Sequence, residues 1–595
     1  MGDRRRERLG SLPDLRRSIS VRRWLLLPSL LVALTSCAVV PTGGPVLEGE
    51  PVRPADAPAE PYVRVLARTP QQGWTPEQIV RNFLNASASF QDDHGVARQY
   101  LAPSVRSQWA PESSVDVYDA GPSSRLIVEQ SSGDNAVVTL EADHLATISS
   151  RGQYTAEPPG SRLKAVFRLR KIAGEWRIVN HPSGLMLTEQ DVERAYRTRN
   201  LYFFDPTFQS LVPNPIYLPA GNREDLPTEL TRALLRGATE WLAPAVKNAF
   251  PAGSILVEEV QVSSGRATVV LGGAAIRAGP KQVASMSAQL AWTLGQLRAV
   301  ETVRLKIDGE TVHVRSAGET VSMDDWASLD PGGTSGTVHG YVVRDKTLLV
   351  TTQDGLRPAP GPAGSQNVPV HSPAVSLDAK HVAWVSTSEQ KLFVGQLREG
   401  GTYDVRLTGA GLQSLTWDRY GNLWVVEGAG KRSVVWMLED GVRPIRVDLS
   451  ELEAKNVQVR ALRVARDGTR VAMIIDSKGD SRVLLGRIER ADDAVRVADL
   501  KLIPTKLAQV TDVAWHDADE LAVVGKDPQG VLAPYLVRVD GTSVSSVGGT
   551  GEAVSIAAAP HVPILVERKD SEIWRYQDTL RWELVAGGSQ PVYPG

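Results

Sequence analysis

Residues 464–468 read Val-Ala-Arg-Asp-Gly, and the apolar run Val-Ala-Met-Ile follows at 471–474. The same order, an aspartate in a tight turn and then an apolar strand, returns around Asp378, Asp418 and Asp517. Together with Asp467, these aspartates lie 40, 49 and 50 residues apart. Because a four-stranded propeller blade takes ~40–50 residues, this period predicts a β-propeller.

The repeat also assigns roles within each unit. We expect each aspartate to cap its turn by accepting hydrogen bonds from its own backbone, and the apolar strand after it to lie in the middle of a blade. A weaker fifth unit runs through residues 556–560, and residues 341–351 either complete a sixth blade or close the ring. The C-terminal domain is thus predicted over residues 338–595 as an all-β propeller of five or six blades. An array of β-sandwiches is the alternative.

At the other end of the chain, residues 1–36 have the features of a targeting segment. Arginines dominate the start, and an apolar run of 11 residues extends from Trp24 to Leu34. That run is too short to cross a bilayer, which takes ~20 residues, but it suits the core of a signal peptide. An uncleaved anchor helix is the alternative. The export route, general secretory or twin-arginine, stays open.

The apolar run leads to Cys37, the single cysteine among 595 residues. The sequence Leu34-Thr35-Ser36-Cys37 resembles the bacterial lipobox. This resemblance implies cleavage between Ser36 and Cys37 and an S-diacylglycerol group on Cys37, with palmitate-type acyl chains; N-acylation of the new terminus is left open. Two acyl chains give stable anchoring where one is marginal. The expected location is therefore the outer face of the cytoplasmic membrane, with the Pro- and Gly-rich residues 37–61 as a flexible tether.

Residues 62–199 are predicted to form an α+β domain. Thr75-Pro76-Glu77-Gln78 is a helix start, with Thr75 as N-cap and Gln78 completing a capping box. Apolar residues at spacings of three and four follow on one helical face, at positions 79, 83, 86 and 90. A second short helix is expected over residues 95–101, and then a meander of strands that ends with Glu-Trp-Arg-Ile-Val at 175–179. This order resembles the NTF2-like fold.

Residues 200–318 are predicted to form a second α+β domain. A helix is expected to stop at Gly237, and residues 255–257 and 267–270 are expected to form a hairpin across Ser263-Ser264-Gly265. An amphipathic helix carries apolar residues at 283, 286, 290, 294 and 297, and Asp308-Gly309 is a favoured hairpin dipeptide. The succession of "NPIYLPAG", "ALLRGATEWLA" and "LAWTLGQLRAVETVRLKIDGE" resembles the GerMN domain.

Composition excludes several classes of function. The 66 Lys and Arg against 68 Asp and Glu give a formal net charge of -2, without the basic excess that nucleic-acid binding requires. One cysteine excludes a disulfide framework, a multi-cysteine zinc site and an iron–sulfur cluster. None of the nine histidines forms a metal-ligand spacing, and His516, beside Asp517 and Asp519, is assigned a structural role in a turn. No catalytic residue, metal or cofactor is predicted, and the chain is not expected to be an enzyme.

A lipobox, an NTF2-like domain, a GerMN domain and a propeller, in this order, resemble the actinobacterial lipoprotein LpqB family over essentially the whole chain. The resemblance implies a surface accessory of a two-component system. LpqB-like proteins associate with the extracytoplasmic domain of the MtrB sensor histidine kinase and modulate signalling to MtrA, which bears on cell-wall homeostasis and division. Only Cys37 is carried over as a family residue.

Two other functions stay open at this stage. One is a surface receptor that binds a wall fragment or a lipid in the NTF2-like or propeller cavity; a closed, apolar or aromatic-lined cavity would favour it. The other is a hydrolase, which would need titratable groups that converge in one cleft.

Overall fold

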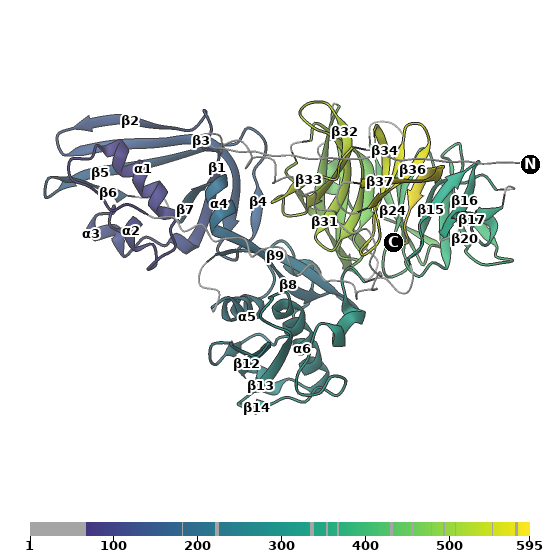
Figure 1. The fold of residues 1–595 in the computed structure, drawn as a ribbon, viewed down its shortest axis with the longest axis horizontal. Coiled ribbons are helices and arrows are strands. Elements are labelled where there is room, and N and C mark those ends of the chain that lie inside the picture. Colours follow the sequence, from purple (N-terminus) through teal and green to yellow (C-terminus); the bar gives the residue numbers. More distant parts are fainter. Residues whose placement is uncertain are drawn as a thin grey trace, which may run out of the picture. The chain divides into compact units, whose positions relative to one another are not determined.

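The computed structural model describes residues 67–595 except 181–182, 221–224, 334–337, 353–354, 366–367, 429–431, 454–456, 478, 492–493, 506, 550 and 578–580. The predicted signal segment, Ser36, Cys37 and the tether lie outside the described residues. Tyr62–Gly595 form one unit, in which three domains follow each other along the chain (Figure 1). No helix in the described ranges combines the length and the apolar character needed to cross a membrane.

The N-terminal domain is a mixed sheet covered by short helices (Figure 1). Its strands run in the order β6-β5-β3-β1-β7, and β2 and β4 both pair with β3. The elements are α1 (Pro76–Ser87), α2 (Gly95–Arg98), α3 (Pro103–Arg106), η1 (Pro111–Ser113), β1 (Ser114–Tyr118), β2 (Arg125–Ser132), β3 (Asn135–Ser149), β4 (Tyr154–Ala156), β5 (Arg162–Ile172), β6 (Glu175–Asn180), β7 (Leu185–Thr188) and α4 (Glu189–Ala195).

The first helix confirms its sequence signals. Thr75 and Gln78 form the reciprocal capping box, and Pro76 occupies the first turn. The apolar face packs on the sheet, where Phe83 lies with its ring centroid 5.3 Å from that of Trp109 and 6.1 Å from that of Phe167. These three aromatic side chains are buried, so they fill the interior of this domain between helix and sheet. The second helix ends at Arg98, three residues earlier than the sequence suggests.

The middle domain begins with a long two-stranded ribbon, β8 paired with β9. A separate sheet, in the order β10-β12-β13-β14 with β11 paired to β12, carries the helices α5 and α6. The elements are β8 (Tyr196–Phe204), β9 (Leu211–Pro219), α5 (Leu226–Arg236), η2 (Ala243–Ala245), β10 (Ser254–Leu256), β11 (Gln261–Ser263), β12 (Arg266–Gly273), η3 (Ala274–Arg277), α6 (Pro280–Gly295), β13 (Thr302–Ile307), β14 (Glu310–Thr311) and η4 (Asp324–Leu329).

The turn and cap residues of this domain act as predicted. Gly237 caps α5 with φ of 96°. Asp308 and Gly309 both have positive φ, 53° and 79°, which the tight turn of a two-residue hairpin requires. The turn at Ser264-Gly265 is present, but its first strand is β11 and not residues 255–257, since β10 pairs with the far end of β12. The two strands β12 and β13 are parallel, with α6 as their crossover.

In the described part of the C-terminal domain, the strands form six antiparallel sheets of four strands each. In the order in which the strands pair, they are β17 (Gly355–Pro358), β16 (Thr347–Thr352), β15 (Tyr341–Arg344) and β38 (Ser589–Val592); β18 (His371–Val375), β19 (His381–Val385), β20 (Lys391–Gln396) and β21 (Tyr403–Thr408); β22 (Leu412–Trp417), β23 (Leu423–Glu427), β24 (Val434–Glu439) and β25 (Arg443–Arg446); β26 (Gln458–Val464), β27 (Arg470–Ser477), β28 (Asp480–Ala491) and β29 (Ala494–Leu502); β30 (Gln509–Asp517), β31 (Glu520–Lys526), β32 (Leu532–Arg538) and β33 (Val544–Ser546); β34 (Ala553–Ala557), β35 (Leu565–Arg568), β36 (Glu572–Gln577) and β37 (Arg581–Gly587). The short helices η5 (Pro362–Gly364) and α7 (Ser450–Glu453) connect them.

The six sheets close into a ring. Strands β38, β18, β22, β26, β30 and β34 contact one another in that order, and β34 returns to β38. The first sheet joins the two ends of the domain, because its strands β15–β17 come from the start and β38 comes from the last residues. A ring of sheets with one innermost strand each is a propeller-type arrangement, whereas an array of β-sandwiches has no such closure.

The aspartates of the repeat lie in the predicted turns. Asp378 accepts a hydrogen bond from the backbone N–H of Lys380, Asp467 from Thr469 and Asp517 from Ala518. Asp418 accepts from two backbone N–H groups and from the indole of Trp424. The apolar strands after the turns are fully buried, as in Val382–Val385, so the repeat's role assignments are confirmed.

Candidate functional site: the central channel of the C-terminal domain

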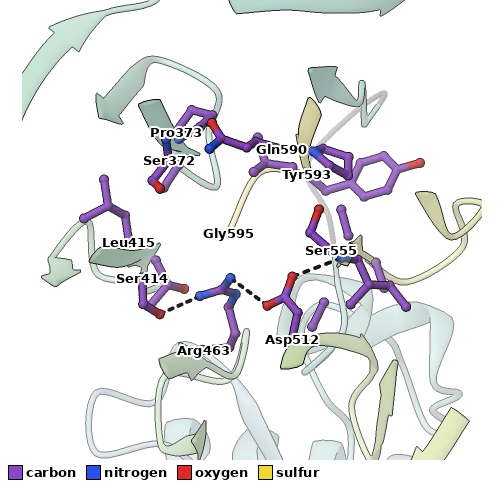
Figure 2. A pocket seen from close by; sticks show the side chains of 18 of the residues that line it. Ser372, Pro373, Ser414, Leu415, Arg463, Asp512, Ser555, Gln590, Tyr593 and Gly595 are labelled. Carbon is purple, nitrogen blue, oxygen red and sulfur yellow. Dashed lines mark hydrogen bonds and ion pairs between the residues drawn. The ribbon is translucent and has the colours of Figure 1, made fainter. Parts of the chain in front are cut away.

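The six innermost strands surround a cavity of about 520 Å³ in the described part of the C-terminal domain (Figure 2). Every sheet contributes residues to the wall of this cavity, because the innermost strand of each sheet lies next to the ring axis. A volume of this size lies within the roughly 300–1,000 Å³ typical of small-molecule sites. The lining is mixed, with hydroxyls, an amide and four charged side chains beside aliphatic and aromatic ones.

The innermost strands share a local irregularity. In each of the six sheets the pairing of the innermost strand with its neighbour shifts register, which marks a β-bulge or a related irregularity. Ser372, Ser414 and Gln590 adopt positive φ of 45°, 52° and 50° on these strands. A bulge bends the strand and redirects the side chains next to it, so the channel wall carries polar groups that a regular ladder would hold elsewhere.

These polar side chains connect neighbouring sheets to each other. The Gln590 amide oxygen accepts from the backbone N–H of Ser372 at 2.9 Å, and the Ser414 hydroxyl accepts from that of Leu462 at 2.7 Å. In the same way an Asp512 oxygen accepts from the N–H of Ile556 at 3.0 Å. Each of these bonds satisfies a backbone donor across a sheet boundary. We call this set of side chains, Gln590, Ser414 and Asp512, the channel belt, because it holds neighbouring sheets to one another.

Arg463 extends this belt across two boundaries (Figure 2). Its Nη1 donates to the Ser414 hydroxyl at 2.8 Å, and its Nη2 lies 3.3 Å from Asp512 Oδ1. Burial raises the pKa of Asp512, while the charge of Arg463 and two backbone N–H donors act in the opposite direction. The guanidinium and the carboxylate therefore neutralise each other inside the channel wall.

A second arginine, Arg466, lines the channel and packs against Gly595, the last residue of the sequence. Its Nη2 donates to the carbonyl oxygen of Pro594, and its Nη1 is buried without a hydrogen-bond partner among the described atoms. Burial alone lowers the pKa of this guanidinium to about 10. Because an arginine remains protonated at that value, the wall holds a buried cation whose hydrogen-bonding capacity is not filled.

An acidic group, Glu567, completes the charged lining. Its Oε2 accepts from the Ser555 hydroxyl at 2.7 Å and from the backbone N–H of Gln590 at 2.9 Å. Among the described residues it forms no ion pair with a basic side chain. The charged side chains of the lining are thus two arginines, Arg463 and Arg466, and two acidic residues, Asp512 and Glu567, and Arg463 and Asp512 pair with each other.

The residues singled out in the sequence lie elsewhere. Ser36 and Cys37 are outside the described residues, so the lipidation site remains a prediction. His516 lies 3.8 Å from Glu520, and burial lowers its pKa. No group of three or more potential metal ligands occurs in the part of the chain that the structure describes.

The channel residues themselves were missed by sequence reasoning. Arg466 lies beside Asp467 in the repeat, but nothing in the sequence pattern marks it as buried. Arg463 and Asp512 are 49 residues apart and show no motif. The repeat places them only approximately, since Arg463 lies four residues before Asp467 and Asp512 lies five before Asp517, and the strand of Asp512 shifts register next to it.

Comparison with known protein families gives three matches along the chain. Residues 346–594 match the "Lipoprotein LpqB beta-propeller domain", and residues 69–193 match the "Lipoprotein LpqB, N-terminal domain". Residues 200–313 match the "Sporulation and spore germination" family. The descriptions are those of a lipoprotein with a propeller domain and not of an enzyme family.

Curated relatives cover nearly the full chain. The lipoprotein LpqB of Thermobifida fusca is 36% identical over 95% of this chain and 97% of its own length. That of Streptomyces coelicolor is 31% identical over 95% of this chain and 96% of its own. A solved structure, TolB from Acinetobacter baumannii, is similar over 56% of this chain and 88% of its own, at 14% identity and with a TM-score of 0.33. The resemblance found in the sequence is confirmed: the chain belongs to the lipoprotein LpqB family.

Proposed function

We propose that this chain is a lipid-anchored protein of the outer face of the cytoplasmic membrane that binds the extracytoplasmic domain of an MtrB-like sensor histidine kinase. By binding one state of that domain better than another, it modulates two-component signalling linked to cell-wall homeostasis and division. The observation that carries the proposal is membership of the lipoprotein family over 95% of the chain. A lipoprotein on the outer face of the membrane can influence a response regulator in the cytoplasm only by acting on a membrane-spanning partner.

The finer architecture belongs to the same proposal. We infer an NTF2-like fold for the N-terminal domain and six blades for the propeller. A helix packed on a mixed sheet supports the first inference, and the closed ring of six four-stranded sheets supports the second. Both domains then act as rigid bodies that present surface to a partner.

The middle domain offers a surface for such contact. Ile255 on β10, Val257 directly after β10 and Ile276 on η3 are 55%, 59% and 51% exposed, and β10 and η3 contact each other. Single exposed aliphatic residues are ordinary, but a cluster of branched aliphatic side chains on adjacent elements favours a protein interface. We assign the kinase contact to this patch.

In-cell crosslinking of the full-length lipidated protein tests the kinase proposal. Mass spectrometry of the captured partners is expected to identify a sensor histidine kinase, and Val257→Asp is expected to reduce that capture severalfold. Val405→Asp is the matched control, since Val405 is 48% exposed on a strand of another domain. Capture without any histidine kinase would overturn the proposal, and equal effects of the two variants would overturn the assigned patch.

The anchor is tested separately at Cys37. Cys37→Ser is expected to leave the signal segment attached, because cleavage follows lipidation, and to remove the acyl mass from the protein. Intact-mass measurement of membrane-extracted protein reads both changes. If the unsubstituted protein carries a free thiol at Cys37, the lipoprotein part of the proposal fails.

A second candidate is a surface receptor for a wall fragment or a lipid. The cavity of about 520 Å³ in the propeller channel favours it. The interior of the N-terminal domain is occupied by the aromatic side chains of Phe83, Trp109 and Phe167, so the channel is the stronger location. A mixed polar lining also fits a polar fragment better than a lipid chain.

A further inference from the structure

The sheet of the N-terminal domain buries one face and exposes the other. Along β5, Ala165, Phe167 and Leu169 are buried, whereas Arg168 and Arg170, which alternate with them, are exposed. Successive side chains of a strand point to opposite faces of a sheet. The buried face is the one that packs against α1, so these two arginines lie on the solvent face.

A third arginine joins them on the neighbouring strand. Arg177 on β6 is the direct register partner of Arg170 on β5, so the two side chains share the solvent face. Like charges directly opposite each other on neighbouring strands repel. We call Arg168, Arg170 and Arg177 the arginine cluster.

The arginine cluster differs from the basic residues farther along the same face. There Glu141 lies 2.9 Å from Arg125 and 3.6 Å from Lys164. In the described part of the chain, by contrast, no acidic side chain forms an ion pair with the cluster. Arg177 donates to the carbonyl oxygen of Trp176 at 2.7 Å, which leaves its charge without a counter-ion.

The acidic residues nearest to the cluster along its strands do not balance it. Glu175 accepts from the backbone N–H of Gly73 at 3.3 Å, and Asp134 is exposed in the turn before β3. Lys171, whose backbone N–H donates to the carbonyl oxygen of Asp134, adds a further positive charge. Residues 134–135 and 168–177 together therefore carry four basic and two acidic side chains.

The turn between β5 and β6 adds an exposed apolar side chain next to the cluster. Ile172 is 37% exposed at the end of β5, directly before the turn residues Ala173 and Gly174, whose φ angles are 51° and 82°. Apolar area and basic charge together are what a protein surface needs to bind an anionic membrane interface.

The chain enters the domain beside this cluster. The backbone N–H of Gly73 bonds to Glu175 on β6, the strand that carries Arg177. Residues 38–66 alone separate Cys37 from the first described residue. A segment of that length spans about 30 Å as a random coil and at most ~100 Å when extended. An anchor at Cys37 thus keeps the cluster within reach of the membrane surface.

We propose that the arginine cluster and Ile172 contact the anionic phospholipid headgroups of the membrane that holds the anchor. This rests on the proposed lipid anchor and is independent of the kinase contact. Guanidinium groups bind phosphate oxygens through paired hydrogen bonds, and each basic side chain strengthens contact with an anionic surface about fivefold. Because the tether makes the contact intramolecular, a weak affinity is sufficient to orient the domain.

Spin labelling of the full-length lipidated protein tests the proposal, in phosphatidylcholine vesicles with and without phosphatidylglycerol. Asn135→Cys places the label opposite Arg170, and Asn85→Cys places a control label at an exposed position of α1. Collisions of the label with a water-soluble nickel complex are expected to fall severalfold at position 135 when phosphatidylglycerol is present. They are expected to stay unchanged at position 85.

Paired substitutions identify the residues responsible. Arg168→Gln combined with Arg170→Gln is expected to abolish the difference between the two kinds of vesicle. Arg81→Gln combined with Arg398→Gln changes the net charge equally at exposed positions outside the cluster, and it is expected to preserve the difference. Thermal unfolding verifies the fold, and the cluster variant is not expected to unfold at a lower temperature, since it relieves a repulsion.

The possible results separate the contact from the anchor. Equal collision rates at position 135 in both kinds of vesicle overturn the contact, as does protection that persists in the cluster variant. Equal protection at positions 135 and 85 overturns the assigned face. A second label on a free Cys37, visible as added mass, overturns the anchor and with it the basis of the contact.

Discussion

Asp467 shows how one repeat residue holds its sheet together. One of its oxygens accepts from the backbone N–H of Thr469 at 2.7 Å, and the other accepts from the guanidinium of Arg470 at 2.6 and 2.8 Å. Both side chains of the ion pair are only 1% exposed. The arginine also stacks 5.2 Å from the ring centroid of Trp515 on the next sheet. The turn aspartate thus stabilises a buried cation between two sheets.

Asp467→Ala is therefore expected to destabilise the C-terminal domain strongly. It leaves the charge of Arg470 buried without a counter-ion, a change that costs about 3–5 kcal/mol. Differential scanning calorimetry of the full chain should show a lower unfolding temperature for this domain. Asp480→Ala is the control, because it removes an ion pair with Arg482 whose side chains are about half exposed, 51% and 44%, worth about 0–1 kcal/mol. Similar shifts for both variants would refute the role of burial.

At the scale of elements, helix α6 contributes many of the buried side chains in the core of the middle domain. Met286, Leu290 and Leu294 are fully buried at spacings of four, and they pack against strands β8 and β13. The helix begins at Pro280, which has no N–H to leave unpaired in the first turn. The apolar positions predicted from periodicity are buried from Met286 onward, but the helix is not buried on one face alone, because every residue from 286 to 294 is buried.

Leu290→Ala should loosen this element measurably. Removing buried methyl groups and leaving a cavity costs about 2–5 kcal/mol. Hydrogen exchange of peptides covering residues 280–295 should speed up accordingly. Lys281→Ala, on the exposed part of the same helix, is expected to change stability by no more than about 0.5 kcal/mol. Unchanged exchange in Leu290→Ala would contradict the packing described for α6.

At the scale of the whole molecule, the three domains meet around Trp241. Its indole N–H donates to the carbonyl of Asp499 in the C-terminal domain at 2.7 Å, and its backbone N–H donates to the Gln153 amide of the N-terminal domain at 3.0 Å. Lys501 lies with its Nζ 5.4 Å from the Trp241 ring centroid and 3.3 Å from the Thr155 hydroxyl. A partly buried lysine of the C-terminal domain thus contacts both other domains.

This lysine makes stability depend on pH. Burial lowers the pKa of Lys501 to about 8, with Asp499 and Glu240 opposing that shift and Arg487 adding to it. Between pH 8 and about 10.4 the unfolded chain keeps a proton that the folded chain has released, so stability rises with pH in that range. The free energy of unfolding of the wild type minus that of Lys501→Met should therefore be lowest at neutral pH and rise by about 3 kcal/mol at most by pH 10.5.

Chemical denaturation at several pH values measures this difference. Lys391→Met, at an exposed position of β20, is the control for the loss of a lysine as such. If the free energy of unfolding of the wild type minus that of Lys501→Met stays constant between pH 7 and 10.5, Lys501 is not desolvated where the three domains meet.

The sequence by itself determined the features that depend on neighbours along the chain. The Thr75 cap, the apolar positions of α6, the Asp308-Gly309 turn and the aspartate turns of the repeat follow from backbone preferences and periodicity, which act within a few residues. Together with the order of the domains, they also identified the family.

Only the tertiary structure decided what depends on residues far apart. Ring closure pairs Tyr341 with Val592, and the channel belt joins Ser414, Arg463 and Asp512 from three sheets. No local preference encodes such contacts, because they form only when closure of the ring brings the bulged inner strands to one axis. Arg466 is part of a turn motif in the sequence, and it becomes a buried cation facing a cavity only in the closed ring.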